Sequence, residues 1–178
     1  MFRRKRIPIG YEDFKQIIDG NFYYVDKTML IYELLSDGGQ NNLITRPRRF
    51  GKTLNFSMLK YFFDITEKDN AYLFDGLKIS EHYDEAAEYR NAHPVIMLSL
   101  KCGKQGDYNR AVRSICFEIQ EQFKKYRSIS ASEKVDVTDR KRFEAIADSI
   151  DPDETTFAES IKLLSRCLMQ YYGKKSII

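Results

Sequence analysis

The stretch that most constrains this chain runs from residue 41 to residue 65, where an apolar segment, a basic loop and an amphipathic helix follow one another. The segment NNLIT predicts a short strand. The segment LNFSMLKYFFDI predicts a helix, because Leu54, Met58, Phe62 and Ile65 share one stripe. Between them, TRPRRFGKT ends as a phosphate-binding loop ends. A helix that follows such a loop directly presents free N–H groups to an anion.

The last residues of this loop have separate expected roles in binding a nucleotide. Gly51 allows the backbone to approach the phosphates, Lys52 neutralises the terminal phosphates, and the Thr53 hydroxyl binds Mg²⁺. The nucleotide-binding residues are predicted to be consecutive in the chain: Arg48, Arg49, Phe50, Gly51, Lys52, Thr53 and Leu54. Thr53 is also the predicted metal contact.

The loop departs from the usual motif where Arg46 replaces the leading glycine. A Gly-Lys-Ser/Thr triplet occurs by chance in about one chain in ten of this size, so a simple basic turn is the alternative interpretation. Arg46 would need a negative φ, and Pro47 favours an extended backbone before it. Arg48 and Arg49 either add charge to the phosphate site or form a solvated basic edge.

Apolar periodicity predicts further helices outside the loop. They are expected after Asp13, from residue 27 to the glycines at 38 and 39, between 107 and 126, and from Asp151 to Gly173. Asp151, Pro152 and Glu154 have the spacing of a helix start with a capping box. The segment 127–150 is polar at its start and is interpreted as a surface loop or insertion.

Additional strands are predicted at VIMLSL, residues 95–100, and at the final residues SII. The unbroken apolar character of VIMLSL is typical of a central strand covered on both faces. The predicted fold class is therefore α/β, a P-loop NTPase-like parallel sheet flanked by helices and incomplete at the C-terminus.

Composition excludes several other classes of protein. The 29 basic and 26 acidic residues give a net charge of +3, which is too small to indicate a nucleic-acid partner. Cys102, Cys116 and Cys167 are widely spaced and are expected to be buried free thiols in a reducing cytosol. The basic N-terminus lacks the apolar run of a secretory signal, and no run is long enough for a membrane span. A cytoplasmic location with no membrane partner is expected.

Successive segments of the chain resemble the bacterial AAA-ATPase-like family. They are IPIGYEDF, YYVDKT, NLITRPRRFGKTLNFSMLKYFF, HPVIMLSLK and YYGKKSII, in register with the family motifs. The resemblance implies a P-loop domain that uses ATP and Mg²⁺, and a loop in which arginines replace glycine as a family trait. It also implies a C-terminal nuclease-like domain of the PD-(D/E)xK type in many relatives, and with it a possible nucleic-acid partner.

The same resemblance implies that residues 1–178 are the N-terminal part of a longer ATPase. Its expected divisions are 1–36 as an N-terminal segment, 37–126 as the P-loop and first α/β units, 127–150 as the loop, and 151–178 as a helix leading into the Walker B strand. The chain stops at Ile178, before the acidic residues of that strand. Nucleotide binding without hydrolysis is therefore expected of this piece alone.

Other residues are weaker candidates. Asp26 and Lys27 belong to the motif YYVDKT; a helix cap or a surface ion pair is the alternative to a role near the adenine. The triplets that begin at Asp13 and Asp139 lack the context of a nuclease site, and His82 and His93 lack a ligand set. A rival function is a nucleic-acid-binding or interaction module that uses the loop arginines and the N-terminal segment FRRKR without nucleotide chemistry.

Overall fold

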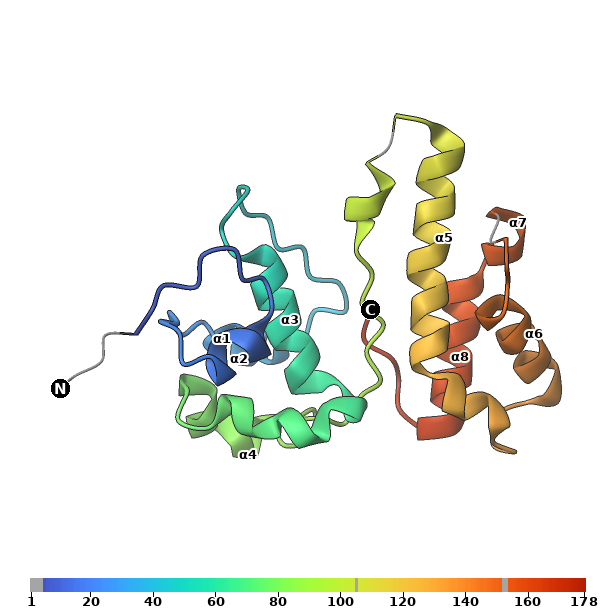
Figure 1. Ribbon diagram of the computed structural model, residues 1–178. Coiled ribbons are helices and arrows are strands. Elements are labelled where there is room, and N and C mark those ends of the chain that lie inside the picture. Colours follow the sequence, from blue (N-terminus) through green and yellow to red (C-terminus); the bar gives the residue numbers. More distant parts are fainter. Residues whose placement is uncertain (1–4, 105, 152–153) are drawn as a thin grey trace. The chain divides into compact units, whose positions relative to one another are not determined.

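The structure is a computed structural model that describes residues 5–104, 106–151 and 154–178 (Figure 1). The chain divides into two compact units, Met1–His93 and Pro94–Ile178, called unit 1 and unit 2 below. No helix among the described residues is long and apolar enough to cross a membrane.

Unit 1 is built from short helices joined by long irregular segments. In chain order they are α1 (Phe14–Asp19), α2 (Met29–Ser36), α3 (Lys52–Phe63), η1 (Ile65–Phe74), η2 (Lys78–His82) and α4 (Tyr83–Ala86), where η denotes a 3-10 helix. The helices predicted after Asp13, after residue 27 and after the basic loop are confirmed by α1, α2 and α3.

An aromatic core joins α1, α3 and η1 within unit 1. The Phe74 ring lies 5.1 Å from both the Phe14 and the Phe62 ring centroids, and all three side chains are fully buried. Met58 is also fully buried. Because Met58 and Phe62 come from α3, this core fixes the helix that begins at the basic loop.

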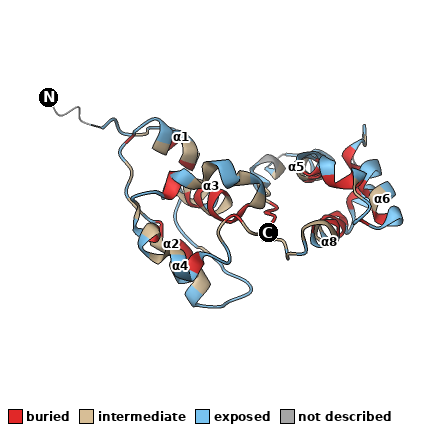
Figure 2. Ribbon diagram, turned by 90° about the horizontal axis from the view of Figure 1, so that it is seen from below, coloured by how far each residue is buried: buried red, intermediate tan, exposed pale blue. Residues whose placement is uncertain are grey.

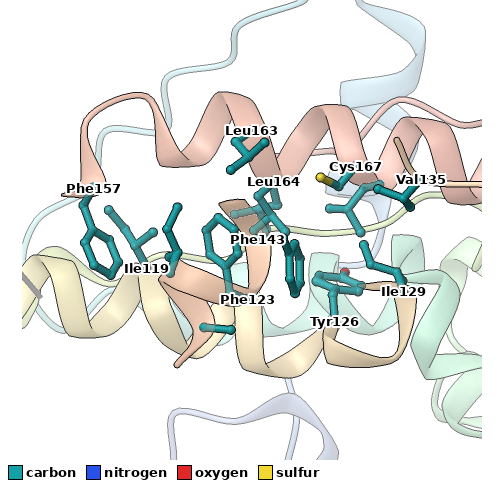
Figure 3. Packing of buried hydrophobic residues seen from close by; sticks show 14 of the residues in the cluster. Ile119, Phe123, Tyr126, Ile129, Val135, Phe143, Phe157, Leu163, Leu164 and Cys167 are labelled. Atoms are coloured by element: carbon teal, nitrogen blue, oxygen red, sulfur yellow. The ribbon is translucent and has the colours of Figure 1, made fainter. Parts of the chain in front are cut away.

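Unit 2 packs its helices around one apolar core (Figure 3). Its elements are η3 (Leu100–Gly103), α5 (Tyr108–Lys125), η4 (Arg127–Ala131), α6 (Val137–Ala147), α7 (Glu154–Phe157) and α8 (Ser160–Tyr172). The Phe123 ring of α5 and the Phe143 ring of α6 lie 4.9 Å apart, with Leu164 of α8 fully buried in the same cluster. The buried stripes of α5 and α8 are visible as red faces in Figure 2. The predicted helix from 107 to 126 is confirmed by α5.

The thiols of unit 2 follow the sequence-based expectation. Cys116 and Cys167 are thiols buried in this core. Burial raises the pKa of Cys167 to about 11, which keeps the thiol protonated and unreactive. The side chain of Cys102 lies outside the described part of the structure.

The predicted α/β fold with a parallel sheet is wrong: the described residues form helices and no sheet. Extended pairing is limited to isolated parallel bridges, Asp64 with His93 and Val95 with Ile177. Along VIMLSL, side chains from the end of α5 and from its C-cap take backbone N–H groups that a ladder would use. The Val95 N–H donates to the hydroxyl of the C-cap residue Tyr126 at 2.9 Å, and the Met97 N–H donates to Gln122 Oε1 at 3.2 Å. The segment NNLIT forms no strand.

The segment 127–150 contains η4 and α6 instead of the expected polar loop. Asp136 caps α6 by accepting from the N–H groups of Thr138 and Asp139 at 2.8 and 3.2 Å. Phe143 and Ile146 then face the core at helical spacing. The polar start of the segment obscured this short apolar face, because only its last turn carries large apolar side chains.

The helix expected from Asp151 to Gly173 is broken into α7 and α8. Glu159 has φ 59°, a left-handed backbone that interrupts the helix before Ser160. Gly173 ends α8 with φ 68°, as predicted. Pro152 and Asp153, which belong to the predicted capping box, lie outside the described residues.

Candidate phosphate-binding loop

The basic loop turns into α3 through left-handed residues. Arg49 has φ 68° and Gly51, at the N-cap of α3, has φ 71°. A residue of ordinary φ followed by a left-handed one turns successive N–H groups to one side, the arrangement that binds anions. Arg46 is not among the positive-φ residues, as the sequence required. The left-handed residues of this loop are therefore Arg49 and Gly51, and Arg46 is not one of them.

The backbone at Gly51 leaves room for a ligand. A Cβ atom placed there would meet no heavy atom within 4 Å, so the space beside this residue is open. The free N–H groups of the first turn of α3 lie directly after it. Glycine suits this position because of its positive φ, and the space beside it is open.

Lys52 is folded back onto the loop that precedes it. Its Nζ donates to the carbonyl oxygen of Arg46 and, at 3.5 Å, to that of Pro47. Residues 46 to 52 are thereby closed into a ring around the start of α3. The ammonium lies on the loop, where phosphate oxygens would replace the carbonyls as its partners.

The arginines of the loop are exposed and make no ion pair within the described residues. This holds for Arg46, Arg48 and Arg49, and the Phe50 side chain beside them is 58% exposed. Thr53 and Leu54 follow on the first turn of α3 and are half-buried. The structure thus brings all the predicted nucleotide-binding residues, 48–54, onto one loop and helix start.

Side chains of α3 fasten this helix to the motif that contains Asp13. The Phe14 N–H donates to Ser57 Oγ at 2.6 Å, and the Tyr61 hydroxyl donates to Asp13 Oδ2 at 3.1 Å. Burial and the neighbouring carboxylate raise the pKa of Tyr61, so the hydroxyl remains a donor. Asp13 also caps α1 by accepting from the Gln16 N–H at 3.0 Å. The segment IPIGYEDF therefore has a structural role in holding α3.

The motif YYVDKT is likewise explained in part by backbone capping. Asp26 Oδ1 accepts from the Thr28 N–H and hydroxyl at 2.9 and 2.7 Å, and its Oδ2 accepts from the Lys78 N–H at 2.8 Å. Burial opposes ionisation of Asp26, but these hydrogen bonds outweigh it and lower the pKa of the carboxyl. Asp26 therefore ties the start of α2 to η2, whereas Lys27 is exposed.

Sequence reasoning missed Asn55, which lies on the buried face of α3 with Met58 and Phe62. Asn55 is 3% exposed, and its Nδ2 has no hydrogen-bond partner in the described structure. The signal was present in the spacing, because positions 55, 58 and 62 share a helical face and a polar residue stands among apolar ones.

The weaker candidates are not assembled into a site. Asp139 is bound by Arg166, with Oδ1 and Oδ2 accepting at 2.6 and 2.8 Å. The His82 ring lies 4.3 Å from the Tyr32 ring in a tilted arrangement. Within the described residues, no group of three or more His, Cys, Asp or Glu side chains could hold a metal ion. Most of the segment FRRKR lies outside the described residues.

An open hollow of about 840 Å³ occurs in unit 2, away from the predicted loop residues in sequence. Its walls come from α5, α7, α8 and the final residues, and they are mainly apolar, with Ile119, Phe157 and Ile161 among them. It contains none of the predicted nucleotide-binding residues.

Comparison with known proteins agrees with the motifs in the sequence. Residues 8–178 match the AAA-ATPase-like family, described as predicted AAA-ATPase, and the chain belongs to that family. It is also 37% identical over 101 residues to an uncharacterized protein in the vnfD 5′ region of Azotobacter chroococcum mcd 1. That match covers 56% of this chain and 18% of the relative's length. No solved structure gave a significant match.

Proposed function

We propose that residues 46–54 bind the phosphates of ATP, as its Mg²⁺ complex, in a cytoplasmic ATPase of which this chain is part. The observation that carries the proposal is the position of Lys52, whose ammonium lies on carbonyls of the preceding loop while Gly51 opens the backbone beside it. Membership of a predicted ATPase family supports ATP as the nucleotide.

Each residue has a distinct role in the proposed site. The N–H groups from Gly51 onward receive phosphate oxygens, and the positive end of α3 favours their charge. Lys52 exchanges its carbonyl partners for the terminal phosphates, which are better acceptors because they are charged. The Thr53 hydroxyl is the protein ligand to Mg²⁺, and bound Mg²⁺ supplies charge neutralisation. Arg48 and Arg49 are exposed beside the loop and add positive potential.

We assign binding, and not hydrolysis, to these residues. Hydrolysis and any action on nucleic acid belong, in this proposal, to the longer ATPase and its partners.

The exposed arginines support nucleic-acid binding as a second candidate function, so the test must separate the two. Binding of labelled ATP and of labelled single-stranded DNA would be measured by fluorescence anisotropy at about 50 and about 200 mM salt. Over this range, affinity for a nucleic-acid backbone falls steeply. A nucleotide site keeps most of its ATP affinity, and unlabelled DNA does not displace ATP. Binding of DNA that unlabelled ATP does not compete with, together with no ATP binding, would overturn the proposal.

A further inference from the structure

Asn55 is a buried polar side chain that the described structure leaves without a partner. It lies on α3 one turn after Gly51, and its own N–H donates to the Gly51 carbonyl at 2.9 Å. Its side chain is 3% exposed, and Nδ2 neither reaches solvent nor finds an acceptor in the described residues. Leaving a buried amide unpaired costs stability, and a leucine of the same size would avoid that cost.

The direction of the Asn55 side chain connects it with the loop. In an α-helix the Cα–Cβ bond tilts toward the N-terminus, so a side chain covers the turn before its own position. For Asn55 that turn begins at Gly51, where the loop enters α3. This tilt places the unpaired amide beside the turn by which the loop enters α3.

Two carbonyl oxygens of the loop before α3 already accept hydrogen bonds from a lysine. Lys52 Nζ bonds the carbonyl oxygens of Arg46 and Pro47. When the ammonium turns to a phosphate, these carbonyls lose their donor. A second donor behind the loop would restore the ring without the lysine.

We propose that Asn55 is a positioning residue that donates from Nδ2 to a loop carbonyl released by Lys52 when nucleotide binds. This inference rests on the proposed function and deepens it, since it gives the Asn55 amide a hydrogen bond in the nucleotide-bound loop. Each group then has a hydrogen-bond partner in the bound state. Lys52 donates to phosphate instead of to the loop carbonyl, and the Asn55 amide donates to that carbonyl. The unpaired amide of the free chain thus favours the closed, nucleotide-bound loop.

The test compares the wild-type chain with Asn55→Leu, which keeps the size and removes the donor, and with Asn55→Ala. Two quantities are measured: the Kd for Mg-ATP, and amide hydrogen exchange of residues 46–51 with and without saturating Mg-ATP. We expect the unfolding midpoint of Asn55→Leu to equal or exceed that of wild type without nucleotide. We expect its Kd to be about tenfold weaker, as for loss of one hydrogen bond in the bound state.

The exchange measurement distinguishes positioning from packing. Nucleotide should slow exchange of 46–51 in wild type and leave it fast in both variants, even at saturation. Wild-type affinity and wild-type protection in either Asn55 variant would overturn the inference and leave the proposed function intact. No Mg-ATP binding by the wild-type chain would overturn both. If Asn55→Leu does not fold, Asn55→Ala gives the same decision.

Discussion

Unit 1 and unit 2 are similar in length but differ in what holds them together. Unit 2 relies on apolar stripes of its longer helices, α5, α6 and α8, which meet in one core. Both units also contain side chains that bond distant backbone groups, among them Gln120 and Gln122 in unit 2 and Asp26, Ser57 and Asn91 in unit 1. In unit 1, the bonds of Ser57 and Asn91 hold α3. Thr28, at the same junction as Asp26, is fully buried and accepts from the Ile79 N–H at 3.1 Å.

The kinds of contact that hold each unit together bear on where the candidate site forms. An apolar stripe fixes helices against one another but places few polar groups. Bonds from side chain to backbone fix irregular segments at chosen positions, which a loop that closes on Lys52 requires. In unit 1, the bonds of Ser57 and Asn91 fix α3, the helix that begins at the proposed phosphate site.

The largest expected effect tests the apolar character of unit 2. Phe123→Ala should lower the free energy of unfolding by about 3–5 kcal/mol, because the ring is fully buried against Phe143. Phe117→Ala is the matched control, because Phe117 lies on the same helix but is 42% exposed. This substitution should lower the free energy of unfolding far less. Urea unfolding followed by circular dichroism measures both. Equal losses of unfolding free energy in the two variants would show that the buried apolar stripe of α5 is not what stabilises unit 2.

The next effect tests the polar fastening of unit 1. Asn91 Nδ2 donates to the Tyr61 and Asp64 carbonyls at 2.9 and 3.0 Å, at the end of α3. Asn91→Ala should cost about 2 kcal/mol, because buried carbonyls lose their donor. Asn91 has φ 48°, so Asn91→Gly, which loses the same donor but tolerates this φ, should cost less than Asn91→Ala. Thermal unfolding of the three proteins decides, and an unchanged midpoint for Asn91→Ala would show that unit 1 does not depend on such bonds.

The smallest effect concerns the polar pair inside unit 2 and depends on pH. The Arg166 guanidinium, together with Gln170, lowers the pKa of Asp139 below its ordinary value. Because the folded-state pKa is depressed, the carboxylate stabilises the fold above its unfolded pKa and loses that contribution as pH falls through the folded pKa. Asp139→Asn should cost roughly 1–2 kcal/mol at pH 7, reduced by solvent around the half-exposed Arg166.

The control for that prediction is the pH series itself. Unfolding midpoints of wild type and Asp139→Asn, measured from about pH 7 down to about pH 2, should converge at the acid end, where both side chains are neutral. A constant gap between the two curves would show that the Asp139 charge is not the cause.

Several helix positions could be predicted from the sequence, but the lack of a sheet among the described residues could not. The stripes through Phe14, Met58 and Phe123 gave α1, α3 and α5 at nearly the right bounds. The apolar run at 95–100 was compatible with a strand, and only the structure shows side chains of α5 bonding its backbone. A short apolar run does not show which groups its backbone will bond. Whether it pairs with another strand or with side chains depends on tertiary structure.

The candidate site was predictable in its residues and not in its geometry. The spacing of Gly51, Lys52 and Thr53 indicated the loop before its shape was known. The left-handed turn at Arg49 and the unpaired amide of Asn55 were not predicted. A non-glycine residue with positive φ is uncommon, and the partner of a buried amide depends on segments distant in sequence.

The most direct test of the account is a calorimetric titration of Mg-ATP into the wild-type chain, Lys52→Ala and Lys68→Ala in one buffer. Lys68 is an exposed lysine of the same unit, so its removal changes the net charge equally. We expect saturable binding of Mg-ATP by wild type and Lys68→Ala, and loss of that binding in Lys52→Ala. Equal binding by all three proteins, or no binding by wild type, would contradict the claim that the loop closed by Lys52 is a nucleotide site.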